Sequence, residues 1–469
     1  PIPRGPEVAE PTPEPATLPE TRYVTLEDKV HLPLLYISYP TVSLGDPQEP
    51  ALDIFADVLG GSASSMLYQS LVKTGKAIEV GASHSCEELA CTLAVYAYPN
   101  PAVDGSLKTL KGEVDKVIGE FAQRGIKPAD LEKAISSYRA SAIWGLDSIE
   151  GKVSQLAMGQ VMTRDPNYVF KNLDAISQVN AQQVKAAYDK FIANRHSVVL
   201  SVVPKGKTQW QAGTPNFTPA KRELPDYSQH GEPLVQQTIK DNFDRSAQPR
   251  TAEAVSVKVP AIWHGKLDKG IEIIGTRSDE IPAVSIMIAL PGGIRAEGKG
   301  ELGLASLTAA MLGQGTARLS EAELSDELQK LGASISVSTA QYNNLITISS
   351  LTDKLPQTLA LVREVLLQPG LREADFERLK AQMLQGMQQS EQQPEWLAGQ
   401  AFRELVYGKQ NRLGQPTDGV LTDVEKLTLA DVKRFYEAYY NPTNAKVVVT
   451  GDVTQQQVEQ QLGFLTQWQ

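Results

Sequence analysis

Apolar residues along the chain follow two different periods. Short runs rich in β-branched and aromatic residues predict strands at residues 31–39, 90–98, 197–203, 271–274, 283–290, 334–350 and 446–450. Longer segments with apolar residues three or four positions apart predict helices at 51–59, 107–124, 304–312 and 355–367. Strands that follow one another directly, with helices grouped in sequence, indicate an α+β fold in which helices cover one face of a mostly antiparallel sheet.

One stretch of the sequence occurs twice. Residues 125–133 read GIKPADLEK, and residues 370–378 read GLREADFER, with charge and apolarity matching position by position. Each copy then ends in a β-branched run, at 197–203 and at 446–450. A period this long is typical of duplicated domains rather than of a solenoid, because each copy is large enough to hold its own core. We therefore predict two homologous domains in tandem.

Composition suggests where these domains begin and end. Residues 1–20 are rich in proline and predict an extended linker that follows a preceding domain, so we expect the chain to be a fragment or a processed form of a longer protein. We assign the first domain to residues 21–205 and the second to residues 251–469. The polar, irregular segment 206–250 is predicted to connect them.

Charge and hydropathy exclude two classes of partner. The 469 residues include 45 Lys and Arg against 55 Asp and Glu, a formal charge of −10, and we find no run of basic residues. Nucleic-acid binding without sequence preference needs many cations to neutralise phosphates, so this class is not expected. No apolar stretch approaches the roughly 18 residues that cross a bilayer, so no membrane span is expected either.

The second copy resembles the pitrilysin/insulinase-like peptidases, the inverted zinc metallopeptidases that include mitochondrial processing peptidase. The resemblance lies in its opening at 266–274, in Gly292-Gly293 and in the segment 303–316, GLASLTAAMLGQGT. The first copy resembles the non-metal domain of that family through residues 46–68 and the repeated segment. The family has four homologous domains that close as two halves around a peptide. The resemblance implies domains two and three, with the first and fourth domains or a partner subunit as partners.

The same resemblance assigns the metal positions. In the family, His-x-x-Glu-His places two imidazoles on one helical face, where both reach one zinc, and a Glu about 75 residues further on completes the site. The two His positions are Ser306 and Ala310 here, the position of the base is Ala309, and the third ligand aligns with Gly386. Alanine and glycine have no donor atom, and a serine hydroxyl is a poor zinc ligand.

We therefore expect no metal and no other cofactor in this chain, and zinc in the missing first domain. Where the family's last domain has a substrate-contacting Arg and Tyr, the first copy has Met66 and Ile78.

Two functions follow from these positions. The first is the internal fragment of a zinc metalloendopeptidase that degrades or processes peptides in a closed chamber, inactive by itself. The alternative is a non-catalytic subunit that binds peptides or serves as a scaffold. In either case, peptides are expected to pair with an exposed edge strand. Family analogy suggests a periplasmic or otherwise extracytoplasmic location.

The histidines and cysteines do not predict a metal site. His31, His84, His196, His230 and His264 are scattered, with no short metal spacing, and we expect structural or surface roles for them. Cys86 and Cys91 flank a predicted hairpin turn, which would let them face each other across two strands. They form either a disulfide or two small buried thiols.

Overall fold

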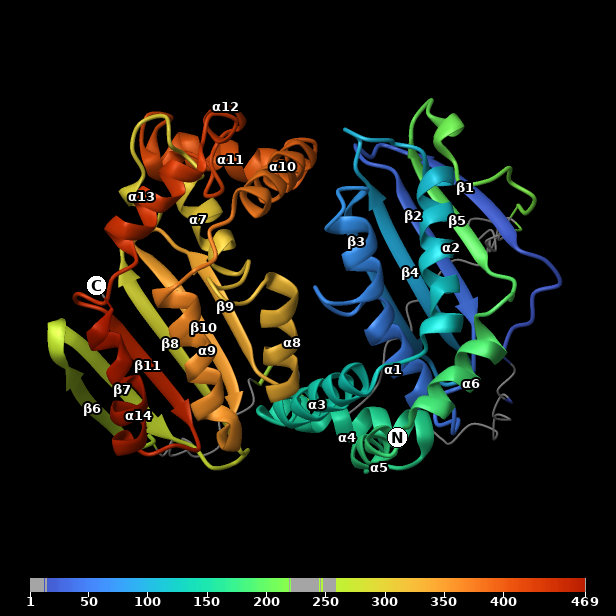
Figure 1. Ribbon diagram of the computed structural model, residues 1–469, viewed down its shortest axis with the longest axis horizontal. Coiled ribbons are helices and arrows are strands. Elements are labelled where there is room, and N and C mark those ends of the chain that lie inside the picture. The colour runs from blue at the N-terminus through green and yellow to red at the C-terminus, as the bar shows by residue number, and fades with distance from the viewer. Residues whose placement is uncertain are drawn as a thin grey trace.

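The computed structural model describes residues 15–218 and 259–468, together with positions 12, 220, 244, 246 and 247. Most of the two predicted linkers lies outside these residues. The described residues form two domains, each a sheet covered by helices (Figure 1). The expected α+β class is confirmed.

The first domain contains a five-stranded sheet. Its strands are β1 Arg22–Asp28, β2 Leu34–Pro40, β3 Ala77–Cys86, β4 Cys91–Pro99 and β5 Val198–Pro204. Its helices are α1 Glu49–Gly60, α2 Leu107–Arg124, α3 Pro128–Trp144, α4 Ile149–Thr163, α5 Tyr168–Ser177 and α6 Ala181–Phe191. Residues 206–218, which the sequence assigns to the linker, still contact this domain, because Asn216 exchanges hydrogen bonds with Thr21 and Tyr23 and Ala212 is buried.

The second domain contains a six-stranded sheet. Its strands are β6 Ile262–Leu267, β7 Ile271–Arg277, β8 Ala283–Pro291, β9 Ser334–Thr339, β10 Asn343–Leu351 and β11 Lys446–Gly451. Its helices are α7 Leu304–Leu312, α8 Glu321–Leu331, α9 Leu355–Leu367, α10 Glu373–Ser390, α11 Pro394–Tyr407, α12 Leu421–Val424, α13 Leu429–Tyr439 and α14 Gln455–Leu462.

The two sheets have the same strand order. The first runs β1-β5-β2-β4-β3, and the second runs β7-β11-β8-β10-β9 with β6 added outside β7. In each sheet the first pair, β1 with β5 or β7 with β11, is parallel, and the following pairs are antiparallel. The edge strands β3 and β9 therefore hold equivalent places in the two sheets.

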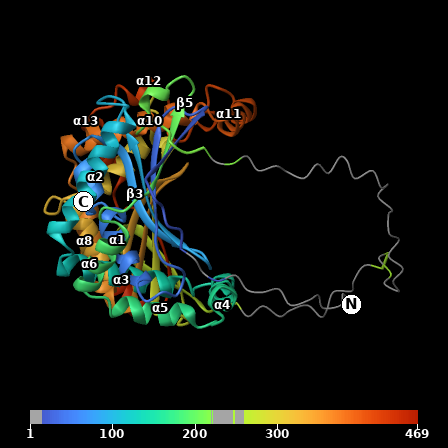
Figure 2. The same cartoon turned by 90° about the vertical axis from the view of Figure 1, so that its right-hand side faces the viewer.

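Alternation along the strands separates a packed face from an open one. In β8, Val284, Ile286 and Ile288 are buried under the helices, whereas Met287 points to the other face and is 41% exposed. Val448 of β11 pairs with Met287 on one side and with Ile274 of β7 on the other, and both Val448 and Ile274 are also exposed. Viewed from the side, the packed helices lie on one side of the sheets, and α4 and α11 lie at the two ends of the other side (Figure 2).

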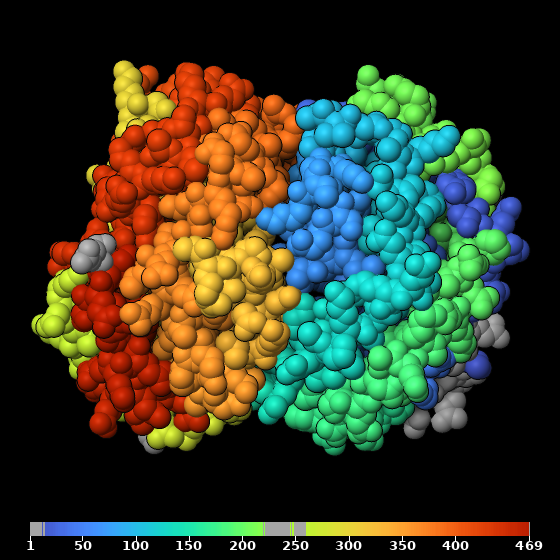
Figure 3. All heavy atoms as spheres, viewed as in Figure 1, coloured from blue at the N-terminus to red at the C-terminus, as the bar shows by residue number. Residues whose placement is uncertain are grey.

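The domains meet along a joint surface in the middle of the molecule (Figure 3). Apolar contact comes from Ile143, Trp144 and Leu146 of the first domain, which pack against Ile281, Ala283 and Leu351 of the second. Both copies of the repeated segment contribute charges to this interface. Lys133 of α3 binds Asp326 of α8, and Arg378 of α10 lies within hydrogen-bond distance of the Tyr68 hydroxyl.

Candidate functional site

Helix α7, which contains three of the four predicted metal positions, is fixed at its first turn by a buried acid. Glu297 accepts hydrogen bonds from the backbone N–H groups of Gly303 and Ala305 at 3.0 and 2.9 Å. The guanidinium of Arg412 lies 2.8 Å from the other carboxylate oxygen. Burial raises the pKa of Glu297, and Arg412 and the helix N–H groups oppose that rise. Its ionised form suits the positive end of the helix dipole.

Helices α7, α10 and α11 and the loop 416–420 surround a cavity of about 660 Å³. Ser306 and Ala310 line it from α7, one helical turn apart, and Gly386 lines it from α10. The structure thus brings together three of the four positions that the resemblance assigns to the metal site. Ala309 is only 4% exposed and does not line the cavity.

The side chains around this cavity do not fit zinc. Of the three converging positions, only Ser306 has a donor atom, a hydroxyl, where zinc prefers imidazole, thiolate or carboxylate. The wall is largely apolar, with Leu379, Met383, Met387 and Trp396. Its charged residues are Arg403, Glu391 and Asp418, and Gln382, Ser390 and Thr417 add uncharged polar groups. Such a lining suits an apolar side chain better than an ion.

Two glycines shape the cavity. Gly303, with φ of +108°, starts α7 in a left-handed conformation, and an added Cβ there would lie 2.8 Å from the carbonyl oxygen of Asp418. Its lack of a side chain therefore lets the loop 416–420 approach the helix. Gly386 has nothing within 4 Å of an added Cβ, so a side chain at this position would extend into open space.

The edge strand β9 lies close to α7 and has β10 as its sole strand partner within the described residues. Its sequence, SISVST, contains no proline and no charged residue, the features by which edge strands usually avoid further pairing. A smaller cavity of about 290 Å³ lies beside it, lined by Leu324, Leu328, Ile335 and Val337 among others. This edge is thus open to an added strand, and a pocket for a side chain lies next to it.

The two substrate-contact positions of the first domain lie differently from each other. Met66 is buried in the core of the first domain. The carbonyl oxygen of Ile78 accepts a hydrogen bond of 2.9 Å from Gln382, which lines the larger cavity. Strand β3 therefore contacts α10 at the edge of the cavity, through its backbone rather than through a polar side chain.

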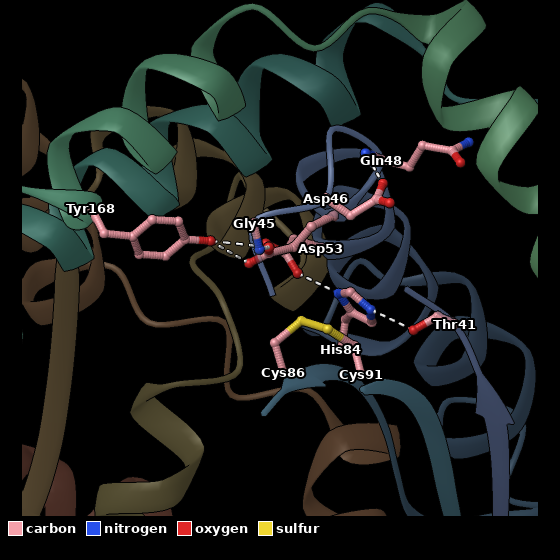
Figure 4. The surroundings of a disulfide bond; sticks show 10 residues. Thr41, Gly45, Asp46, Gln48, Asp53, His84, Cys86, Cys91 and Tyr168 are labelled. Atoms are coloured by element: carbon pink, nitrogen blue, oxygen red, sulfur yellow. Dashed lines mark hydrogen bonds and ion pairs between the residues drawn. A yellow bond between two sulfur atoms is a disulfide. The ribbon is translucent and has the colours of Figure 1, made fainter. Parts of the chain in front are cut away.

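A second cluster lies in the first domain, and the sequence predicts only part of it: a Cys86–Cys91 disulfide is one of its two alternatives, but the place of His84 is not foreseen. The structure joins Cys86 and Cys91 in a disulfide, and the imidazole of His84 lies beside it (Figure 4). Among the described residues, these three form the one group of His, Cys, Asp or Glu side chains placed to hold a metal. The signal was present in the sequence, because residues two apart on a strand share a face and Cys91 pairs with Cys86 across the hairpin.

No helix in the described ranges combines the length and the hydropathy that a bilayer crossing requires.

Comparison with known proteins gives two matching family models. The model of the Peptidase M16 inactive domain matches residues 2–138 and 426–468, and the model of Insulinase (Peptidase family M16) matches residues 273–417.

Individual relatives are distant. The chain is 24% identical over 218 residues to the Non-peptidase homolog YmxG of Helicobacter pylori, covering 45% of this chain and 50% of that protein. It is 19% identical over 211 residues to the Mitochondrial-processing peptidase subunit beta of Saccharomyces cerevisiae, covering 45% and 46%. A solved peptidase M16 inactive domain from Pseudomonas fluorescens aligns with a TM-score of 0.42 and 24% identity, over 44% of this chain and 50% of that chain. The chain thus spans about half the length of these relatives.

Proposed function

The chain belongs to peptidase family M16, the insulinase family, and we propose that it binds peptides within an M16 assembly without cleaving them. The observation that carries the proposal is the cavity at the metal position. Ser306, Ala310 and Gly386 converge there, and together they offer a single hydroxyl as a donor. The three converging positions thus lack the ligands that would hold a zinc ion, which in a zinc peptidase activates water and polarises the peptide carbonyl.

The peptide in this proposal adds to the sheet as a further strand at β9. Main-chain hydrogen bonds to an open edge give affinity with little sequence preference, and side-chain pockets add selectivity. One apolar side chain of the peptide enters the large cavity against Met383, Met387 and Trp396. A second enters the pocket lined by Leu324 and Leu328.

The binding test uses a glycine that faces the cavity. Gly386→Leu fills the cavity and, because leucine favours a helix interior over glycine, does not threaten α10. Excluding one apolar side chain of the peptide removes about 1.5 kcal/mol or more, which is roughly a tenfold loss of affinity. Gly119→Leu is the matched control, because it also lies inside a helix with nothing within 4 Å of an added Cβ, but in the first domain.

Binding is measured by the fluorescence anisotropy of a labelled peptide rich in Val and Thr. A version with proline at alternate positions cannot complete a strand ladder and should bind far more weakly. The proposal fails if both peptides bind equally, if neither binds, or if Gly386→Leu and Gly119→Leu have the same affinity.

We further propose that the zinc chemistry of the assembly belongs to another M16 domain, in the same polypeptide or in a partner chain. Relatives of this chain include a protein named as a subunit of a processing peptidase. Large apolar side chains are exposed on α4, including Ile149 and Val153, and on α11, including Phe402 and Leu405. Exposed apolar faces of this kind are typical of surfaces covered in an assembly.

Sequencing the chains of the native assembly by mass spectrometry tests this step. A domain with an intact His-x-x-Glu-His supports an inactive part of a peptidase. An assembly without that sequence indicates a scaffold of degenerate chains instead.

A further inference from the structure

The disulfide of the first domain lies against a histidine whose side chain is fully buried. The Cys86–Cys91 bond closes the β3–β4 hairpin, and Cys91 is 1% exposed. The imidazole of His84 is 0% exposed and lies between two oxygen partners (Figure 4). Its Nδ1 is 2.6 Å from an Asp53 carboxylate oxygen, and its Nε2 is 2.9 Å from the Thr41 hydroxyl.

We propose that Cys86, Cys91 and His84 form a zinc site, which can bind zinc only after the Cys86–Cys91 disulfide is reduced. The sulfur atoms and a ring nitrogen already lie within 4.8 Å of one another. In a tetrahedral zinc site with Zn–S near 2.3 Å and Zn–N near 2.0 Å, ligand atoms are about 3.3–3.8 Å apart. The ring nitrogen and the sulfurs therefore need to approach one another by about 1 Å to bind one zinc ion. The two sulfurs instead move apart, which they can do once their bond is broken.

The reaction is balanced with a dithiol as the reductant. The dithiol is oxidised to its own disulfide and gives two electrons and two protons to the Cys86–Cys91 bond, which becomes two thiols. Zinc then binds both sulfurs as thiolates, and the two thiol protons pass to solvent. The oxidised protein has no thiolate to offer, so the state of the disulfide decides whether zinc binds.

The hairpin keeps the ligands in place without the covalent bond. Cys86 pairs directly with Cys91 in the antiparallel register, and the neighbouring pairs Ser85 with Thr92 and His84 with Leu93 continue the ladder. Cys86 is half-buried at the hairpin end, so a small dithiol reaches the bond from solvent. Glu87 and Glu88 are exposed at the turn and favour the approach of a cation.

The two oxygen partners of His84 complete the site. One ring nitrogen of His84 gives up its hydrogen bond and binds the zinc. The oxygen that it was bonded to, Thr41 Oγ1 for Nε2 or Asp53 Oδ1 for Nδ1, is then free to bind the zinc as the fourth ligand. The other nitrogen keeps its hydrogen bond. An oxygen that holds the second nitrogen of a metal-bound imidazole is a regular outer-shell feature of zinc sites.

The test uses the full chain with Zn²⁺ and Co²⁺ as probes. After reduction by dithiothreitol and removal of the reductant under nitrogen, we expect one zinc per chain, and none in the oxidised protein. Co²⁺ should give the near-ultraviolet charge-transfer absorption of cobalt–thiolate bonds. The paired variant Cys86→Ser with Cys91→Ser should lose both signals.

Histidine variants test the third ligand. His84→Gln should weaken zinc binding at least a hundredfold, whereas His264→Gln, at an exposed position of β6, should leave it unchanged. Circular dichroism verifies the fold of His84→Gln, and the serine pair keeps the test decisive if that variant unfolds. The proposal is overturned if the reduced chain takes up no zinc, if the serine pair still takes up one zinc, or if the two histidine variants in folded form bind alike.

Discussion

The interface between the domains contains a charge cluster whose disruption we predict in detail. Lys73 Nζ of the first domain lies 2.7 Å from Glu321 and 2.8 Å from Asp375 of the second. Arg378 lies 3.1 Å from Glu321 and 3.3 Å from Asp375, and the Tyr68 hydroxyl donates to Glu321 at 2.7 Å. Lys73→Met keeps the packing of the aliphatic stem and removes the charge.

The size of the effect follows from burial. Glu321 and Asp375 are each 11% exposed and Lys73 is 25% exposed, so these ion pairs are neither superficial nor fully buried. Exposed pairs contribute about 0–1 kcal/mol, and removal of one partner from a fully buried pair costs about 3–5 kcal/mol. Arg378 stays in contact with both acids after the substitution. We therefore predict a loss of about 2 kcal/mol in the free energy of unfolding at pH 7.

The pH dependence has a definite sign. Burial alone raises the pKa of Asp375, but the hydrogen bonds and charges of Lys73 and Arg378 outweigh burial and lower the pKa below its usual value. An acid with a lowered pKa stabilises the folded state above the pKa of about 3.9 that Asp has when unfolded. That stabilisation is lost as the pH falls through the folded pKa. The difference between wild type and Lys73→Met should thus be constant from pH 7 to pH 5 and shrink below about pH 4.

Urea denaturation followed by circular dichroism measures this difference. The matched control is Lys76→Met, three residues along the chain, which removes a single pair with Glu113 at 2.8 Å with side chains 42% and 32% exposed. Lys76→Met should lower the free energy of unfolding by no more than about 1 kcal/mol. Equal losses for the two variants, or a Lys73→Met loss that grows in acid, would refute the reasoning.

Two further predictions concern the second domain. With the disulfide intact, the triple variant Ser306→His, Ala310→His and Gly386→Glu should bind one zinc that a chelator removes, because all three positions line one cavity. Zinc is measured by atomic absorption. A variant without zinc would show that the three positions do not converge as described. Gly293→Ala should lose about 2–4 kcal/mol in thermal denaturation, since its φ is +71° and an added Cβ would lie 2.3 Å from the carbonyl oxygen of Ala340. Gly45→Ala, with φ of +81° and nothing within 4 Å, should lose only about 1 kcal/mol, and equal losses would contradict the role of that contact.

Much of the fold follows from local pattern. The periodicity at 107–124 and 355–367 predicts α2 and α9 with the bounds that the structure has, and the run 283–290 predicts β8 to within one residue. These segments can be predicted from the sequence because each has one buried face, which fixes the period of its apolar residues. Strand β1 was not predicted, because only its pairing with β5 identifies it: no residue of β1 is fully buried.

The site was predictable only where a family pattern exists. The family resemblance identifies Ser306, Ala310 and Gly386, and the structure brings these three positions together. The sequence does not show that their small side chains leave a cavity between the helices. The cluster around His84 depends on a contact with Asp53, 31 residues away in sequence, and on Thr41, 43 residues away. Neither contact has a local signature, since each is made by the packing of β3 against α1 and the end of β2.

The central claim is that this chain holds peptides without cleaving them, and hydrolysis by the purified chain tests it most directly. The chain, with its disulfide intact, is incubated with the labelled Val- and Thr-rich peptide, with and without a zinc chelator, and the products are separated by mass spectrometry. We predict that the peptide is bound and recovered uncut in both cases. Cleavage that the chelator abolishes would contradict it.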